Sequence, residues 1–150
     1  MKKRLFFTFL LLLTNLMASA FDCQVDGIYY NLDTSGKTAE VTYQSLSNSY
    51  RGSVDIPSSV TYNGIKYKVT GIGDGAFWDC SGLTSVTIPN SVTRIRYGAF
   101  YGCSGLTSVT IPSSLTTISN SAFSGCSGLT SVTIPNSVTG IGDRAFWDCI

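Results

Sequence analysis

The chain has 150 residues, the usual length of one domain, and only 13% of them are charged. It has 10 basic residues, 9 acidic residues and no histidine. Removal of the N-terminal Lys2, Lys3 and Arg4 leaves 7 basic residues against 9 acidic ones, which argues against a nucleic-acid-binding protein. Because histidine is the commonest general base and zinc ligand, its absence argues against an enzyme.

Residues 1–20 have the three parts of an export signal. A basic start, Lys2 to Arg4, precedes the apolar run from Leu5 to Leu13 and the small-residue cleavage site Ala18-Ser19-Ala20. The alternative is a membrane anchor, but the apolar run is shorter than the roughly 20 residues that span a bilayer. We therefore predict a secreted or cell-surface protein that begins at Phe21 and has no membrane span after cleavage.

Residues 21–53 are predicted to form an N-terminal β cap. Two segments, 27–32 (GIYYNL) and 39–43 (AEVTY), have the composition of strands, and a turn is expected at 33–36 between them. A cap is expected because the first unit of a repeat stack otherwise exposes an apolar end.

Residues 54–75 are predicted to be a degenerate first repeat. The segment Val54-Asp55-Ile56-Pro57 is similar to the V-T-I-P of the later units. An insertion of nine residues carries Asn63-Gly64 between β-forming residues, which is a strong signal of a hairpin.

A period of 23 residues organises the rest of the chain. Three full units, 76–98, 99–121 and 122–144, share the string SGLTSVTIP in register, and a truncated fourth unit occupies 145–150. In each unit apolar residues alternate with Ser and Thr before a proline, the pattern of a strand with one buried face. Gly82 is expected to supply the backbone freedom with which the chain re-enters this strand.

One unit cannot bury its apolar residues alone, so the units are predicted to stack around a continuous core. The predicted fold is a mainly-β repeat solenoid with one parallel sheet and an N-terminal β cap. The predicted core positions of one unit, with their equivalents in the others, are Leu83, Val86, Ile88, Val92, Ile95, Ala99, Phe100 and Cys103.

The motifs A-F-x-x-C-x-x-L-T-S-V-T-I-P and S-V-T-x-I-G, with the upstream VDGIYYNL and AEVTY, resemble the BspA-like leucine-rich repeat family of surface proteins. The resemblance covers 76–150 well and 54–75 loosely. It implies an exported right-handed solenoid for adhesion or recognition at the bacterial cell surface, with no catalytic residue and no cofactor.

Four cysteines, Cys80, Cys103, Cys126 and Cys149, occupy one repeat position. A metal ladder, disulfides between units and a column of small buried residues are the alternatives. The short C-x-x-C spacing of metal sites is absent, and side chains of an in-register column point the same way, which does not suit a disulfide. We predict buried, reduced thiols and no metal site.

The outward Ser and Thr of each predicted strand form a regular hydroxyl array: Ser85 and Thr87, Ser108 and Thr110, Ser131 and Thr133. A flat face that binds ice or sugar is one interpretation. A simply solvated sheet face is favoured, because duplication of a repeat alone produces such regularity.

Partner-binding candidates are the exposed positions at which the units differ. One column carries Trp78, Tyr101 and Trp147, and one unit carries Arg94 and Arg96. Aromatic and arginine side chains are the commonest hot spots of protein interfaces. We predict that Trp78, Tyr101 and the two arginines form one patch for a protein or glycan partner. The alternative for the aromatic residues is partial burial against the neighbouring turn.

The only acid–base candidates are the carboxylate pairs Asp74 with Asp79 and Asp143 with Asp148, which have no supporting histidine. A strand predicted from Leu129 to Ile134 has no strand after it, so self-association through this open edge is expected. The competing interpretation is a truncated structural fragment of a longer surface protein, with no binding activity of its own.

Overall fold

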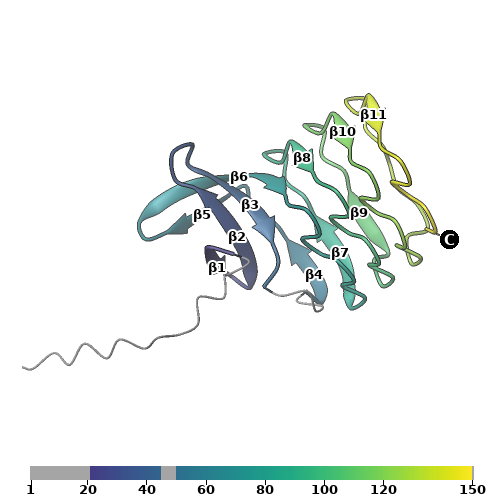
Figure 1. The fold of residues 1–150 in the computed structure, drawn as a ribbon, viewed down its shortest axis with the longest axis horizontal. Coiled ribbons are helices and arrows are strands. Elements are labelled where there is room, and N and C mark those ends of the chain that lie inside the picture. The colour runs from purple at the N-terminus through teal and green to yellow at the C-terminus, as the bar shows by residue number, and fades with distance from the viewer. Residues whose placement is uncertain (1–20, 45–49, 150) are drawn as a thin grey trace, which may run out of the picture.

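The computed structural model describes residues 21–44 and 50–149, and all regular secondary structure within them is β-strand (Figure 1). The predicted export signal, residues 1–20, lies outside the described residues. In the part of the chain that is described, no helix is long and apolar enough to cross a membrane. From the cap onward, successive turns of the chain stack side by side, so the predicted repeat solenoid is confirmed.

Three antiparallel strands begin the structure: β1 (Cys23–Val25), β2 (Ile28–Asp33) and β3 (Thr38–Thr42). The two strands predicted in this region are confirmed as β2 and β3, whereas the three residues of β1 are too few to show an alternating pattern. In the turn between β2 and β3, the Asp33 carboxylate accepts the backbone N–H of Ser35 at 3.0 Å.

The predicted hairpin is confirmed as β5 (Ser59–Tyr62) and β6 (Ile65–Ile72). Its turn residues Asn63 and Gly64 have φ of 49° and 75°, as the tight two-residue turn requires. Beyond the hairpin, β6 pairs in parallel with β3 on one side and with β8 (Arg94–Ile95) on the other. The inserted hairpin strand therefore joins the cap to the repeats.

The repeats carry two parallel sheets, which corrects the prediction of a single one. The short sheet consists of β4 (Gly52–Asp55), β7 (Leu83–Thr87) and β9 (Ser108–Thr110). The long sheet continues from the cap through β6 and β8 to β10 (Thr117–Ile118) and β11 (Gly140–Ile141). A strand of two residues is too short to show an alternation of buried and exposed side chains. The sequence pattern therefore does not reveal the repeat strands of the long sheet.

A column of aromatic rings runs through the core. Phe77, Phe100, Phe123 and Phe146 are stacked, with consecutive ring centroids 4.8, 5.0 and 5.3 Å apart. The ring of Tyr50 lies 4.5 Å from that of Phe77 and extends the column toward the cap. The stacking brings each unit into register with the next.

The predicted core positions from β7 to the turn after β8 are buried: Leu83, Val86, Ile88, Val92, Ile95, Phe100 and Cys103. The last unit departs from the prediction, because no further rung of the described chain covers it. There Val132, Ile134, Val138 and Phe146 are only half-buried, and Ile141 is 57% exposed.

The strand predicted at 129–134 is wrong, since the structure assigns no strand there. A cleft of about 290 Å³ lies between β9 and this segment, lined by Thr110, Ser131 and Thr133 among others. A strand needs a hydrogen-bonded neighbour, and the hydrogen-bonded ladder of the short sheet stops at β9. Self-association through this end of the molecule stays a prediction.

The glycine at the repeat position of Gly82 acts through its missing side chain rather than through an unusual backbone angle. A Cβ added at Gly105 would lie 2.2 Å from the carbonyl oxygen of Ser81, and one at Gly128 would lie 2.6 Å from that of Ser104. Gly82 is not among the glycines with positive φ. Its predicted role as a flexible joint is therefore wrong: this repeat position lets consecutive rungs approach closely.

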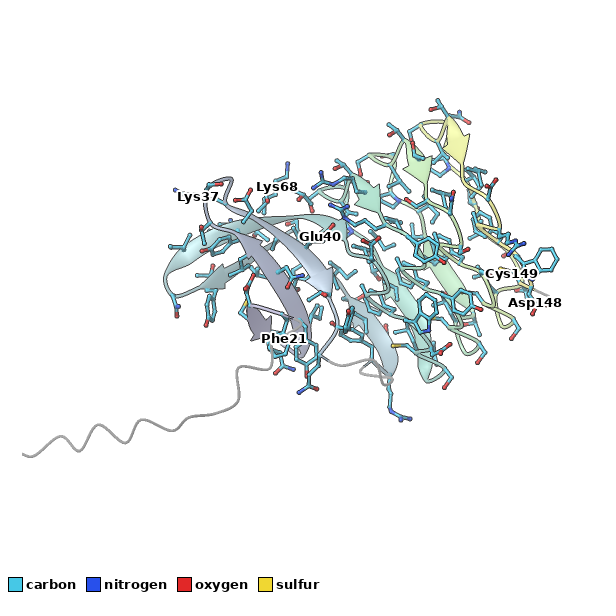
Figure 2. The ribbon with its side chains drawn as sticks, viewed as in Figure 1. Phe21, Lys37, Glu40, Lys68, Asp148 and Cys149 are labelled. Atoms are coloured by element: carbon cyan, nitrogen blue, oxygen red, sulfur yellow. The ribbon has the colours of Figure 1, made fainter. Side chains whose placement is uncertain are left out.

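The cysteine column is buried at Cys80, Cys103 and Cys126, as predicted, and half-buried at Cys149 near the C-terminal end (Figure 2). Each thiol from Cys103 onward donates a hydrogen bond to a phenylalanine carbonyl oxygen one rung earlier, over 2.9 Å from Cys103 and 3.1 Å from Cys126 and Cys149. A hydrogen bond with Cys126, together with burial, raises the pKa of Cys103. Burial also raises the pKa of Cys149.

Replacement of Phe100 by alanine should lower the free energy of unfolding by about 3–5 kcal/mol, because it opens a cavity between two stacked rings. Urea denaturation measures the loss. Phe146→Ala is the matched control, since Phe146 belongs to the same column but is half-buried, and it should cost clearly less. A loss below about 1 kcal/mol for Phe100→Ala would contradict its core position.

The thiols should react slowly with a disulfide reagent in the folded protein, because burial keeps the reagent away and a raised pKa keeps Cys103 and Cys149 protonated. The half-buried Cys149 should react first, and Cys149→Ser should remove that phase. Denaturant should make all five cysteines reactive. Fewer than five titratable thiols without reductant would show that a disulfide is present.

Candidate partner-binding surface

Two of the predicted aromatic candidates form a stacked pair on the turns that follow β6 and β8. The rings of Trp78 and Tyr101 have centroids 4.2 Å apart and an interplanar angle of 20°, and both side chains are half-buried. A Cβ added at Gly98 would lie 2.9 Å from Trp78 Cζ3, and Gly98 has a φ of 56°. The alternative of partial burial is confirmed, since Trp78 packs on Gly98 of the neighbouring turn, and the role of the two rings in binding a partner stays a prediction.

Trp147 lies apart from that pair. The residue of the same column in the intervening unit is Ser124, which is buried and carries no ring to continue the stack. Trp147 is 65% exposed, and the guanidinium carbon of Arg144 lies 5.9 Å from its ring centroid. A cation at that distance from an indole face is attracted by the ring.

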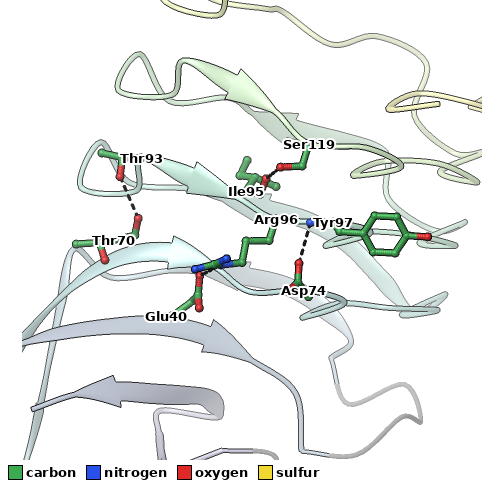
Figure 3. Close-up of polar contacts among 8 residues, drawn as sticks. All are labelled: Glu40, Thr70, Asp74, Thr93, Ile95, Arg96, Tyr97 and Ser119. Atoms are coloured by element: carbon green, nitrogen blue, oxygen red, sulfur yellow. Dashed lines mark hydrogen bonds and ion pairs between the residues drawn. The ribbon is translucent and has the colours of Figure 1, made fainter. Parts of the chain in front are cut away.

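The two arginine candidates lie on the long sheet, where β8 follows the cap strands. Arg96 Nε donates a short hydrogen bond to Glu40 Oε1 of β3, and this ion pair raises the pKa of Arg96 (Figure 3). The two side chains are 44% and 25% exposed, so solvent screens the pair and it contributes less than about 1 kcal/mol. Its consequence is geometric: it positions the Arg96 guanidinium.

Arg96 lines two clefts of the long sheet. The first, about 280 Å³, lies toward the cap and also contains Arg94, Asp33, Thr38 and Thr70 among its lining residues. The second, about 400 Å³, lies toward the C-terminal units, and its lining includes Asp74, Tyr97, Thr117, Ser119 and Asn120. The structure thus brings Arg94 and Arg96 together, and places Trp78 with Tyr101 on a different segment. That one partner contacts both groups stays a prediction.

Polar side chains around the second cleft hold neighbouring rungs together (Figure 3). Asp74 Oδ1 accepts the backbone N–H of Tyr97 at 3.0 Å, and the Ser119 hydroxyl donates to the carbonyl oxygen of Ile95 at 2.6 Å. Beside the first cleft, which Thr70 lines, the Thr93 hydroxyl donates to the carbonyl oxygen of Thr70 at 3.4 Å. These bonds recur from rung to rung, so the surface is built on a repetitive scaffold.

The sequence analysis missed Tyr97, which is 53% exposed and lines the second cleft. Its equivalents are Asp74 one unit earlier, Asn120 one unit later and Asp143 two units later. A comparison of the units at this position would have found it, because a tyrosine replaces a short polar side chain in one unit only.

The predicted hydroxyl array lies on the short sheet. Thr87 and Thr110 are exposed, and the Ser85 hydroxyl donates to that of Ser53 on β4 at 2.9 Å. The third predicted pair belongs to the segment that forms no strand, so the ordered array has two repeat rungs rather than three. An ice- or sugar-binding role for it stays a prediction.

The carboxylate pairs singled out in the sequence have a structural explanation. Asp79 and Asp148 have φ of 52° and 59°, a left-handed conformation that glycine adopts at the equivalent Gly102 and Gly125. Aspartate tolerates this conformation better than most residues. Within residues 21–44 and 50–149, no group of three or more cysteine, aspartate or glutamate side chains could hold a metal ion.

A family model described as the BspA type leucine rich repeat region matches residues 57–150, with 6 copies. The match includes the degenerate first repeat as well as the 23-residue units. No curated protein matches the chain.

Several solved structures are similar to this chain. A leucine-rich repeat protein from Bacteroides ovatus has 37% sequence identity and a TM-score of 0.76, over 86% of this chain and 33% of that one. One from Bacteroides capillosus has 36% identity and a TM-score of 0.68, over 79% and 86%. A leucine rich cell surface protein from Faecalibacterium prausnitzii has 34% identity and a TM-score of 0.67, over 85% and 34%. This chain spans about a third of the length of the first and the last of these.

Replacement of Gly98 by alanine should strain the left-handed backbone and push Trp78 off its turn, and should thus change the Trp78 fluorescence. Gly64→Ala is the matched control, because Gly64 also has positive φ but its added Cβ meets nothing within 4 Å. Gly64→Ala should lower the free energy of unfolding by about 1 kcal/mol, which is the cost of the backbone strain alone. Equal losses of unfolding free energy for the two variants, with unchanged fluorescence, would contradict the packing of Trp78 on Gly98.

Proposed function

This chain belongs to the BspA-type leucine-rich repeat family, and on that premise we propose that it is a non-catalytic recognition module of the bacterial cell surface. Its partner is a protein or a glycan. Stacked repeats offer an extended surface on a rigid core, which suits the binding of a macromolecule. The similarity to a leucine rich cell surface protein supports this proposal.

The observation that carries the proposal is the half-exposed stack of Trp78 on Tyr101. The core positions stay apolar in each unit, whereas the column of Trp78 and Tyr101 changes its residue, so recognition can change without a change of fold. Large rings that are already ordered lose little conformational entropy on binding. Arg94 and Arg96 on the long sheet and Trp147 near the C-terminal end complete the set of proposed contact residues.

Export is the second part of the proposal. We infer that residues 1–20 direct secretion and are removed, so that Phe21 becomes the N-terminal residue. Phe21 packs on the cap, with its ring centroid 4.7 Å from that of Tyr29, so the chain is anchored to the fold directly after the inferred cleavage site. Mass spectrometry of the secreted protein identifies the cleavage site, and an intact N-terminus would contradict the inference.

A pull-down on panels of host matrix proteins and glycans tests the recognition function. Once a ligand is found, Trp78→Ala and Arg94→Ala should each weaken binding by about 1–4 kcal/mol without altering the fold. Replacement of the short-sheet hydroxyls of Thr87 and Thr110 by alanine is the control and should leave binding unchanged.

Two outcomes would contradict the proposal. If the hydroxyl replacements abolish binding while Trp78→Ala is neutral, the short sheet is the site. If no protein or glycan binds, the chain is a structural repeat segment without a partner of its own.

A further inference from the structure

One column of the repeats changes its chemistry in a single unit. At the positions equivalent to Asp74, the other units carry Tyr97, Asn120 and Asp143. Asp74 Oδ1 accepts the N–H of Tyr97, and Asn120 Oδ1 accepts the N–H of Asp143, each at 3.0 Å. The short polar side chain thus caps the backbone of the next rung, whereas a tyrosine ring cannot cap it in this way. Instead, the Tyr97 ring is 53% exposed.

Tyr97 lies between two clefts. The cleft of about 400 Å³ described above contains Asp74, Thr117 and Asn120. Tyr97 also lines a further cleft, of about 550 Å³, together with Asn120, Asp143 and Arg144. Tyr97 and Asn120 line both clefts, so the exposed ring forms a ridge with polar side chains on each side.

These groups have the chemistry that a sugar ring requires. A pyranose presents an apolar C–H face, which packs on an aromatic ring, and a rim of hydroxyl groups that donate and accept hydrogen bonds. The two rung-capping bonds leave Asp74 Oδ2 as an acceptor and the Asn120 NH₂ group as a donor. The exposed ring can therefore pack on the C–H face of a monosaccharide, while the carboxylate and the amide hydrogen-bond to its hydroxyl groups.

The charges favour a neutral sugar. Asp74 and Asp143 bring negative charge to the two clefts. Of the nearby cations, Arg96 is paired with Glu40, and Arg144, which keeps its charge over the ring of Trp147, offsets one of the two aspartates, so one negative charge remains. A uronic or sialic acid would bring a further carboxylate next to these aspartates, which costs free energy.

We propose that Tyr97 is the stacking platform of a binding site for a neutral glycan, with successive sugars of the chain in the clefts on either side. The proposal rests on the recognition function proposed above and names its ligand class and a residue outside the earlier candidates. Asp74 and Asn120 orient the hydroxyl groups of the sugar that lies on Tyr97.

An array of immobilised hexasaccharides, neutral ones built from glucose, mannose or galactose and acidic ones built from galacturonate or capped with sialic acid, tests the proposal. The protein should bind neutral hexasaccharides, and calorimetry with the best soluble one gives its affinity. Tyr97→Asn should weaken this affinity by about tenfold or more. The same variant restores the short polar residue of the column, so its unfolding midpoint should not fall. Tyr97→Phe should keep the affinity within a few-fold.

Ile65→Asn is the control, because Ile65 is another exposed large side chain, on the hairpin, and its replacement should leave binding unchanged. The proposal is overturned if no neutral hexasaccharide binds, if acidic ones are preferred, or if Tyr97→Asn binds as the unmodified protein does. An empty array with a matrix protein bound through Trp78 would overturn the glycan site and leave the recognition function standing. An empty array with no protein ligand would overturn both.

Discussion

Every rung of this solenoid must place its phenylalanine ring on that of the rung before it. The centroid spacing of 4.8 to 5.3 Å along Phe77, Phe100, Phe123 and Phe146 is close to the separation of hydrogen-bonded strands. One repeat distance therefore satisfies both the ring stack and the two parallel ladders. Units of 23 residues keep both in register, and the nine-residue insertion of the first repeat is accommodated by the β5–β6 hairpin, so that β4 and β6 still pair with β7 and β8.

The same register creates the other columns of the molecule. Cys103 and Cys126 each donate to the carbonyl of a phenylalanine one rung earlier, and Thr107 donates to the carbonyl of Thr84 in the same manner at 3.1 Å. A side chain repeated in register always meets the same neighbour, so one favourable contact is multiplied along the stack. Inward positions therefore stay mostly small or apolar, as where Leu115 replaces Val92, whereas residues of very different chemistry occur at outward positions such as Tyr97 and Arg94.

The two ends of the stack solve the problem of an exposed core differently. At the N-terminal end, β3 pairs with β6, Tyr50 covers Phe77, and the Arg96–Glu40 pair connects cap and repeats. At the other end of the described chain, Ile141 and Trp147 are exposed. The clefts of the candidate surface lie along the long sheet, where the cap and the rungs share one continuous ladder. The scaffold beneath the proposed contacts is therefore continuous from the cap to β11.

The sequence by itself determined the repeat, the buried face of β7, the hairpin at Asn63-Gly64 and the burial of the cysteine column, because each depends on local periodicity or turn chemistry. It also determined the family, since the motifs recur in register. Only the tertiary structure decided what depends on neighbouring rungs. The repeat strands of the long sheet are too short to show a period, and Gly105 is required by a carbonyl oxygen one rung away. Asp79 adopts a left-handed backbone angle that is adopted by glycine at two of its three equivalents. A comparison of the units can single out Tyr97 as the exception in its column, but only the stack places it between two clefts, because what surrounds an outward side chain is set by residues a full repeat distant.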